Sequence, residues 1–186
     1  MQKKHLIKSK IVFLTALIMT IISILGLGCA SSEKAPSDVL LIEGKAVKDQ
    51  AVFTLDELKS MEDGLVEADY FSVNSYGTKG YTHFKGIWVW YLLSKQVNLK
   101  EDASSVTFLA QDGYKVEYTL EDVMKDDYID EQTPETRYKM ILAWEENGYE
   151  LDPKAGMPLQ LVVGQREPGD VNKPYWVKNV MTIRVD

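Results

Sequence analysis

The chain has 186 residues, a formal net charge of −7 and one cysteine, Cys29. The acidic charge argues against nucleic acid as a partner, because the phosphates of nucleic acid would be repelled. Residues 30–186 contain no cysteine, so this part of the chain can form no disulfide, zinc–thiolate site or thiol nucleophile.

The N-terminal segment has the pattern of a secretory signal. Four lysines fall within the first ten residues, and an uncharged apolar run of 15 residues extends from Ile11 to Leu25. This run is shorter than the roughly 20 residues of a membrane-spanning helix. The sequence LGLGCA, residues 25–30, is similar to a bacterial lipobox, in which Gly28 is the last residue removed and Cys29 carries the lipid. The alternatives are an ordinary signal peptide, or an uncleaved anchor, with an incidental cysteine.

We therefore expect three parts: a lipoprotein signal peptide over residues 1–28, a flexible polar tether over 29–38, and one domain over 39–186. Removal of residues 1–28 takes away four lysines and no acidic residue, which changes the charge from −7 to −11. The lipid on Cys29 makes the membrane a predicted partner. The expected location is the outer face of the cell membrane, or the periplasm.

The first half of the domain predicts strands and two helices. A β-branched run over residues 39–47 predicts a strand. Thr54, followed three residues later by Glu57, has the spacing of a capping box and predicts the start of a short helix. Further along, the pattern predicts a strand over residues 66–74, a turn over 77–80 and a largely buried helix over 88–97.

The second half predicts further strands and one helix. Asp112-Gly113 lies between two β-rich runs within residues 104–120 and predicts a hairpin. Thr119 and Asp122 predict the cap of a helix over residues 120–125. Residues 139–151 predict one strand that runs into a turn at Asn147-Gly148, and further strands are predicted over 157–164 and 176–185. Strands and short helices without regular alternation predict an α+β fold with mixed β-sheets.

Several motifs, in their order along the chain, resemble the molybdopterin-binding domain of the sulfite oxidase family. They are FKG at Phe84–Gly86, DGY at Asp112–Tyr114, and PLQLVV followed by WVKNV near the C-terminus. The resemblance covers residues 39–185 and implies the sulfite-oxidase-like fold. It also implies a pterin–molybdenum cofactor whose metal is coordinated by a cysteine sulfur.

The resemblance places that cysteine just after the strand over residues 66–73, next to an asparagine. Asn74 is present, but its neighbours are Ser72, Val73, Ser75 and Tyr76. A serine hydroxyl is a hard ligand that ionises only at very high pH, whereas a thiolate is soft and forms easily. Residues 164–180, GQREPGDVNKPYWVKNV, resemble a subgroup of small extracellular domains that often lacks this cysteine.

Eight residues are candidates for a ligand pocket: Asn74, Tyr76, His83, Gln165, Arg166, Asn172, Trp176 and Lys178. Arg166 and Lys178 could hold a phosphate or carboxylate, and the resemblance implies that basic residues of this region bind the pterin phosphate. Alternatively, Arg166 pairs with Glu167 or Asp170 and fixes a loop. His83 could donate to an anion or serve a structural role. We assign no catalytic residue and no metal ligand.

Three functions remain open. The preferred one is a non-catalytic module that binds a small anionic or heterocyclic ligand, or a partner in the cell envelope. The missing thiolate leads us to expect no bound cofactor. The second is an oxidoreductase that binds molybdopterin, the cofactor named by the resemblance, without a cysteine ligand. The third is a structural lipoprotein domain.

Overall fold

The computed structural model describes residues 39–155 and 158–186, which belong to one compact unit. The predicted signal peptide, the tether and Cys29 lie outside the described residues. Within the described part of the chain, no helix is long and apolar enough to span a membrane.

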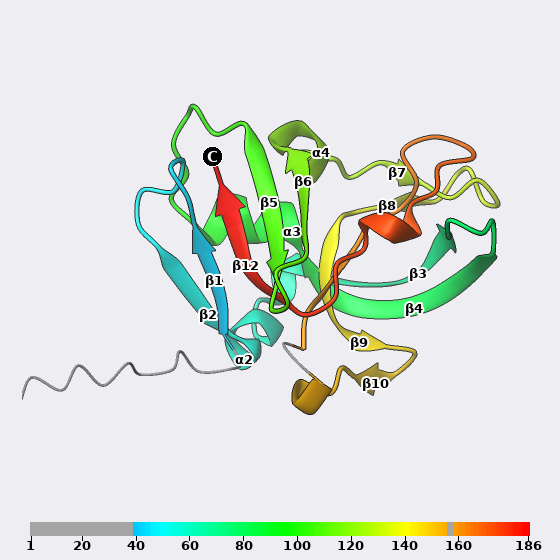
Figure 1. Cartoon of the computed structure of the whole chain (residues 1–186), viewed down its shortest axis with the longest axis horizontal. Helices are drawn as coiled ribbons and strands as arrows, with labels where there is room; N and C mark the ends of the chain where they lie inside the picture. Colours follow the sequence, from blue (N-terminus) through cyan, green and yellow to red (C-terminus); the bar gives the residue numbers. More distant parts are fainter. Residues whose placement is uncertain (1–38, 156–157) are drawn as a thin grey trace, which may run out of the picture. The chain divides into compact units, whose positions relative to one another are not determined.

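One five-stranded sheet has the strand order β2-β1-β12-β5-β6. Its strands are β1 (Val39–Glu43), β2 (Ala51–Thr54), β5 (Ser105–Ala110), β6 (Lys115–Thr119) and β12 (Val180–Val185). β1 and β12 are parallel, whereas the other neighbours are antiparallel. The parallel pair places the first described strand, drawn in blue, beside the last, drawn in red (Figure 1).

A second sheet has the order β10-β9-β4-β3, and β11 pairs with β9 as well. Its strands are β3 (Leu65–Val73), β4 (Lys79–Trp88), β9 (Ile141–Glu146), β10 (Tyr149–Glu150) and β11 (Gln160–Val162). β3 and β4 form the long hairpin in Figure 1. A small separate pair consists of β7 (Tyr128–Ile129) and β8 (Arg137–Tyr138).

The helices are short. They are α2 (Leu55–Lys59), α3 (Val89–Tyr91) with a π-helical turn (Leu92–Gln96), α4 (Leu120–Met124), and 3₁₀ turns at Glu62–Gly64, Pro153–Ala155 and Lys173–Tyr175. The predicted capping box is confirmed, because the Glu57 N–H donates to Thr54 Oγ1 at 3.2 Å and the Thr54 N–H donates to Glu57 Oε2 at 2.7 Å. The cap of α4 is confirmed too, since the Asp122 N–H donates to Thr119 Oγ1 at 3.1 Å. Short capped helices and mixed sheets confirm the α+β class.

A single apolar core joins the two sheets. Leu40, Phe108 and Ile183 come from the first sheet, and Phe84 and Leu142 from the second, and all are fully or nearly fully buried. Burial of each such side chain contributes roughly 1.5–3 kcal/mol. The core therefore accounts for the stability of the unit without any disulfide.

Several predicted boundaries differ from the structure. β1 ends at Glu43 because Gly44 turns the chain with φ 133°. The predicted 77–80 turn lies earlier, where the Gly77 N–H donates to the Asn74 carbonyl at 2.9 Å. The helix predicted from residue 88 begins at Val89, because Trp88 still pairs with β9. The last strand begins only after Asn179, whose φ is 56°.

Candidate functional site

Asn172 joins the end of β3 to the loop that precedes the last strand. Its side chain is fully buried. The Val73 N–H donates to Asn172 Oδ1 at 2.9 Å, and Asn172 Nδ2 donates to the carbonyls of Phe71 and Val163, both at 3.0 Å. The side-chain amide thus bonds the outer edge of β3 as a peptide group of a further strand would.

Gln165 fixes the start of this loop against a neighbouring one. It is fully buried. Its Oε1 accepts from the Glu131 N–H at 3.0 Å, and its Nε2 donates to the Asp170 carbonyl at 2.9 Å. Glu131 in turn accepts from Lys79 Nζ at 2.5 Å and from the Gly169 N–H at 2.7 Å. These bonds connect the start of β4 with both loops.

Arg166 is held by Asp170. Its Nε donates to Oδ2 at 2.9 Å and its Nη2 to Oδ1 at 2.8 Å, which is the two-bond geometry of a strong arginine–carboxylate pair. The guanidinium carbon also lies 4.6 Å from the centre of the Tyr175 ring. Hydrogen bonding to Asp170 raises the pKa of Arg166, and the same bond lowers the pKa of Asp170. The positive charge is therefore already compensated within the chain.

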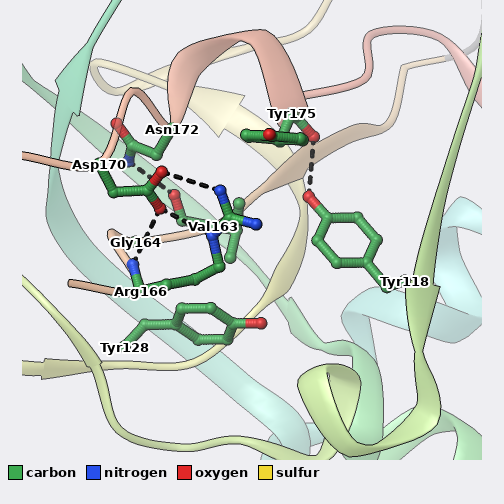
Figure 2. A pocket seen from close by; sticks show the side chains of 8 residues that line it. All are labelled: Tyr118, Tyr128, Val163, Gly164, Arg166, Asp170, Asn172 and Tyr175. Atoms are coloured by element: carbon green, nitrogen blue, oxygen red, sulfur yellow. Dashed lines mark hydrogen bonds and ion pairs between the residues drawn. The ribbon is translucent and has the colours of Figure 1, made fainter.

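A small hollow lies beside this pair (Figure 2). It is lined by Tyr118, Tyr128, Val163, Gly164, Arg166, Asp170, Asn172 and Tyr175. The volume of the hollow that the centre of a water molecule can occupy is about 10 Å³. This is room for about one water. A pterin does not fit into this space.

Two tyrosines of the hollow are neutral hydrogen-bond donors. The Tyr118 hydroxyl donates to the Tyr175 carbonyl at 3.1 Å, and the Tyr128 hydroxyl donates to the Asp122 carbonyl at 2.8 Å. Burial raises the pKa of both phenols. Sequence reasoning did not select them, because a tyrosine whose hydroxyl bonds a main-chain carbonyl has no sequence signature.

Two predicted site residues lie at the tip of the β3–β4 hairpin. Asn74 Oδ1 accepts from the N–H groups of Tyr76 and Thr78, both at 2.9 Å, so its side chain closes its own turn. The Tyr76 side chain is 94% exposed.

The remaining predicted residues are divided between the loop and other surfaces. Trp176 is buried, and its Nε1 donates to the carbonyl of Val163 at 2.9 Å. Lys178 is exposed. The structure thus brings Gln165, Arg166, Asn172 and Trp176 into one loop region. Arg166 and Asn172 line the hollow, whereas Gln165, Trp176 and Lys178 do not.

His83 lies on the exposed face of the β3–β4 hairpin and is not part of the hollow. Its Nδ1 is 2.8 Å from Asp69 Oδ1 and its Nε2 is 3.3 Å from Glu67 Oε1. The hydrogen bond with Asp69 raises the pKa of His83 above its ordinary 6.5. Both ring nitrogens face carboxylates, which suits a cationic imidazolium.

Comparisons with known proteins identify the fold. The model of the oxidoreductase molybdopterin binding domain family matches residues 33–185. No curated protein matches the sequence. Among solved structures, the sulfane dehydrogenase SoxCD from Paracoccus pantotrophus matches with 21% identity and a TM-score of 0.59. The match covers 80% of this chain and 38% of the SoxCD chain, and at this identity it shows the fold alone.

The residues of the site do not fit a molybdenum–pterin group held by a thiolate. The sole cysteine of the sequence is Cys29, so the turn after β3 offers the hydroxyl of Ser75 instead of sulfur, while the Asn74 side-chain oxygen closes that turn. Oxygen ligands of this kind suit hard cations. Among residues 39–155 and 158–186, no group of three or more His, Asp or Glu side chains is arranged to hold a metal ion.

Proposed function

The chain belongs to the oxidoreductase molybdopterin binding domain family, and from this premise we propose that it is a non-catalytic binding member of it. The domain takes a small anionic or heterocyclic ligand, or a partner in the cell envelope. The lipid on Cys29 holds it at the outer face of the cell membrane or in the periplasm. The N-terminal lysines, apolar run and LGLGCA sequence support this location.

One observation carries the non-catalytic assignment: the chain has no sulfur at the end of β3. Ser72 is buried and its hydroxyl faces the Gly80 carbonyl at 3.4 Å. Asn74 uses its side-chain oxygen to close the hairpin turn. A fold persists easily when its chemistry is lost, and the residue that this chemistry requires is missing here.

The proposal allows either a small ligand or a partner in the cell envelope. The contacts favour a partner bound at the surface. The hollow has room for about one water. Arg166, the cation beside it, already forms two bonds with Asp170. A small anion could bond only the guanidinium N–H groups that Asp170 leaves open, and the bound carboxylate would repel it.

The visible spectrum of protein from a host that makes molybdopterin tests the non-catalytic proposal. We expect no absorption from a metal dithiolene and no fluorescent pterin after oxidative release. A pterin signal together with turnover would favour the second hypothesis, an oxidoreductase that binds its cofactor without cysteine.

The proposal that the domain binds a small ligand is tested separately, with inorganic phosphate as the probe. Arg166→Ala should abolish any phosphate-dependent rise in melting temperature if the loop binds anions. Arg184→Ala is a matched control, because both arginines pair with one carboxylate and expose 44% and 45% of their side-chain surface. A phosphate response that survives in Arg166→Ala would reject the loop as the anion site.

The location is tested by Cys29→Ser. This change should release the protein from membranes into the soluble fraction. Retention of the variant in membranes would favour an uncleaved anchor over a lipid.

A further inference from the structure

β3 is an edge strand of the second sheet and is open along part of one side. It pairs with β4 over its whole length, from Leu65 opposite Ile87 to Val73 opposite Lys79. No strand among the described residues pairs with its other side. An open strand edge presents unpaired N–H and C=O groups and is a template for another strand.

Hydrogen bonds at the two ends of β3 show which backbone groups face outward. The Val73 N–H and the Phe71 carbonyl bond Asn172, and the Leu65 N–H bonds the Glu62 carbonyl. Because backbone groups alternate in direction along a strand, those of Glu67 and Asp69 face outward too. No turn, loop or cap of the described residues forms a backbone hydrogen bond with the N–H or C=O of either residue.

The side chains on this stretch define the partner's chemistry. Glu67 and Asp69 are 51% and 68% exposed on one face of the hairpin. The two Glu67 oxygens contact His83 Nε2 at 3.3 Å and Lys85 Nζ at 3.2 Å. Asp69 Oδ1 contacts His83 Nδ1 at 2.8 Å, and no ion pair or hydrogen bond of the described residues engages Asp69 Oδ2. On the other face, Val66 and Ala68 are half-buried and pack against the core. A strand added here would place alternate residues against the two carboxylates and the residues between them against small apolar side chains.

A second copy of this chain is a poor occupant. Two β3 edges paired through these free groups would bring Glu67 and Asp69 of one copy against the same carboxylates of the other. Like charges directly opposite each other across strands are destabilising. A cationic strand can bond the Asp69 oxygen that His83 leaves open and share Glu67 with Lys85. The domain's acidic balance would attract it over longer range.

We propose that the β3 edge from Leu65 to Phe71 binds an extended basic peptide segment as an added strand, with basic side chains at alternate positions opposite Glu67 and Asp69. This mode of recognition takes affinity from main-chain hydrogen bonds and specificity from alternate side chains. It deepens the proposed binding function by naming the surface and the partner. It does not depend on the hollow.

The probe is an acetylated and amidated six-residue peptide that alternates lysine and threonine, with a fluorescent label for anisotropy. Threonine is β-branched and suits the half-buried face. A peptide with three lysines followed by three threonines has the same charge without the alternation. A third peptide replaces lysine by glutamate. We expect the alternating peptide to bind the full chain more tightly than either control.

Two variants of one residue separate the backbone from the charge. Asp69→Asn removes the carboxylate and keeps the outward N–H, whereas Asp69→Pro removes both. Proline is tolerated here because this N–H does not bond β4. We expect the proline variant to bind the alternating peptide about threefold to tenfold more weakly than the asparagine variant, the value of about one hydrogen bond.

Equal binding by these two variants, each shown to be folded by circular dichroism, would overturn the proposal. Equal binding of the alternating and block peptides would overturn it too, because charge alone would then account for the affinity. Self-association of the wild-type chain that Asp69→Pro abolishes would assign the edge to a second copy instead. If the peptide fails to bind protein that lacks pterin and metal, only this inference falls and the non-catalytic assignment stands.

Discussion

Asn172→Ala tests how the end of β3 is held to the loop. The substitution removes one acceptor and two donated hydrogen bonds from a fully buried position. The Val73 N–H and the Phe71 carbonyl belong to buried residues and lose these partners. The Val163 carbonyl still accepts from Trp176 Nε1. Two buried groups left unsatisfied cost about 1–3 kcal/mol each, so we expect a loss of about 2–6 kcal/mol in the free energy of unfolding.

Urea denaturation followed by tryptophan fluorescence measures this loss, with a shift of the midpoint at constant slope. Asn98→Ala is the control, because Asn98 is exposed and such surface changes stay within about 0.5 kcal/mol. A loss below about 1 kcal/mol for Asn172→Ala would refute the reasoning, since it would mean that water or a shifted loop replaces the amide at little cost.

Three further predictions concern the same domain. Gly86→Ala should destabilise the fold strongly, because a Cβ there would lie 2.2 Å from a carbonyl oxygen of the neighbouring strand, whereas Gly80→Ala on the same strand meets nothing within 4 Å and should change the urea midpoint little. Asp69→Asn should lower the pKa of His83 measured by NMR; the raised pKa of His83 contributes stability below pH 6.5 that is lost as the pH rises through the folded value. An unchanged His83 titration would contradict this contact. Asp170→Asn should destabilise the domain at neutral pH, and progressively less as the pH falls below 3.8. The reason is that the lowered pKa of Asp170 contributes stability that is lost when the carboxylate is protonated. A pH-independent effect would argue against the ion pair.

The elements predicted from sequence are those with local signals. The Thr54 and Thr119 caps lie at the starts of α2 and α4, since a cap depends on residues three positions apart. The hairpin at Asp112-Gly113 is present, with Gly113 at φ 89°. The turn at Asn147-Gly148 is present as well, with both residues at positive φ. In each case the residues that give the sequence signal lie within a few positions of the residues that form the cap or the turn.

The elements that sequence reasoning missed are defined by strand pairing and not by a local sequence pattern. β2, β7 and β8 have two to four residues, too few for a periodic pattern, and exist through their pairing with other strands. The start of α3 was misplaced by one residue because Trp88 pairs with Ile141, over fifty positions away. Local apolar composition cannot distinguish such a strand end from a helix start.

The candidate site shows the same division. The Arg166–Asp170 pair was one of two pairings open from sequence, because the residues are four apart. Asn172 was selected as a pocket residue, but its bonds to Phe71 and Val73 span about a hundred positions. Residue type alone gives no indication of such bonds. The predicted roles of Asn74, Tyr76, His83 and Lys178 in ligand binding remain predictions.

Molybdenum analysis of the native protein tests the central claim most directly. The metal-to-protein ratio should be measured by mass spectrometry on protein purified from a host that makes molybdopterin. The absence of a thiolate after β3 predicts a ratio indistinguishable from background. A stoichiometric amount of molybdenum that remains through purification would contradict the account.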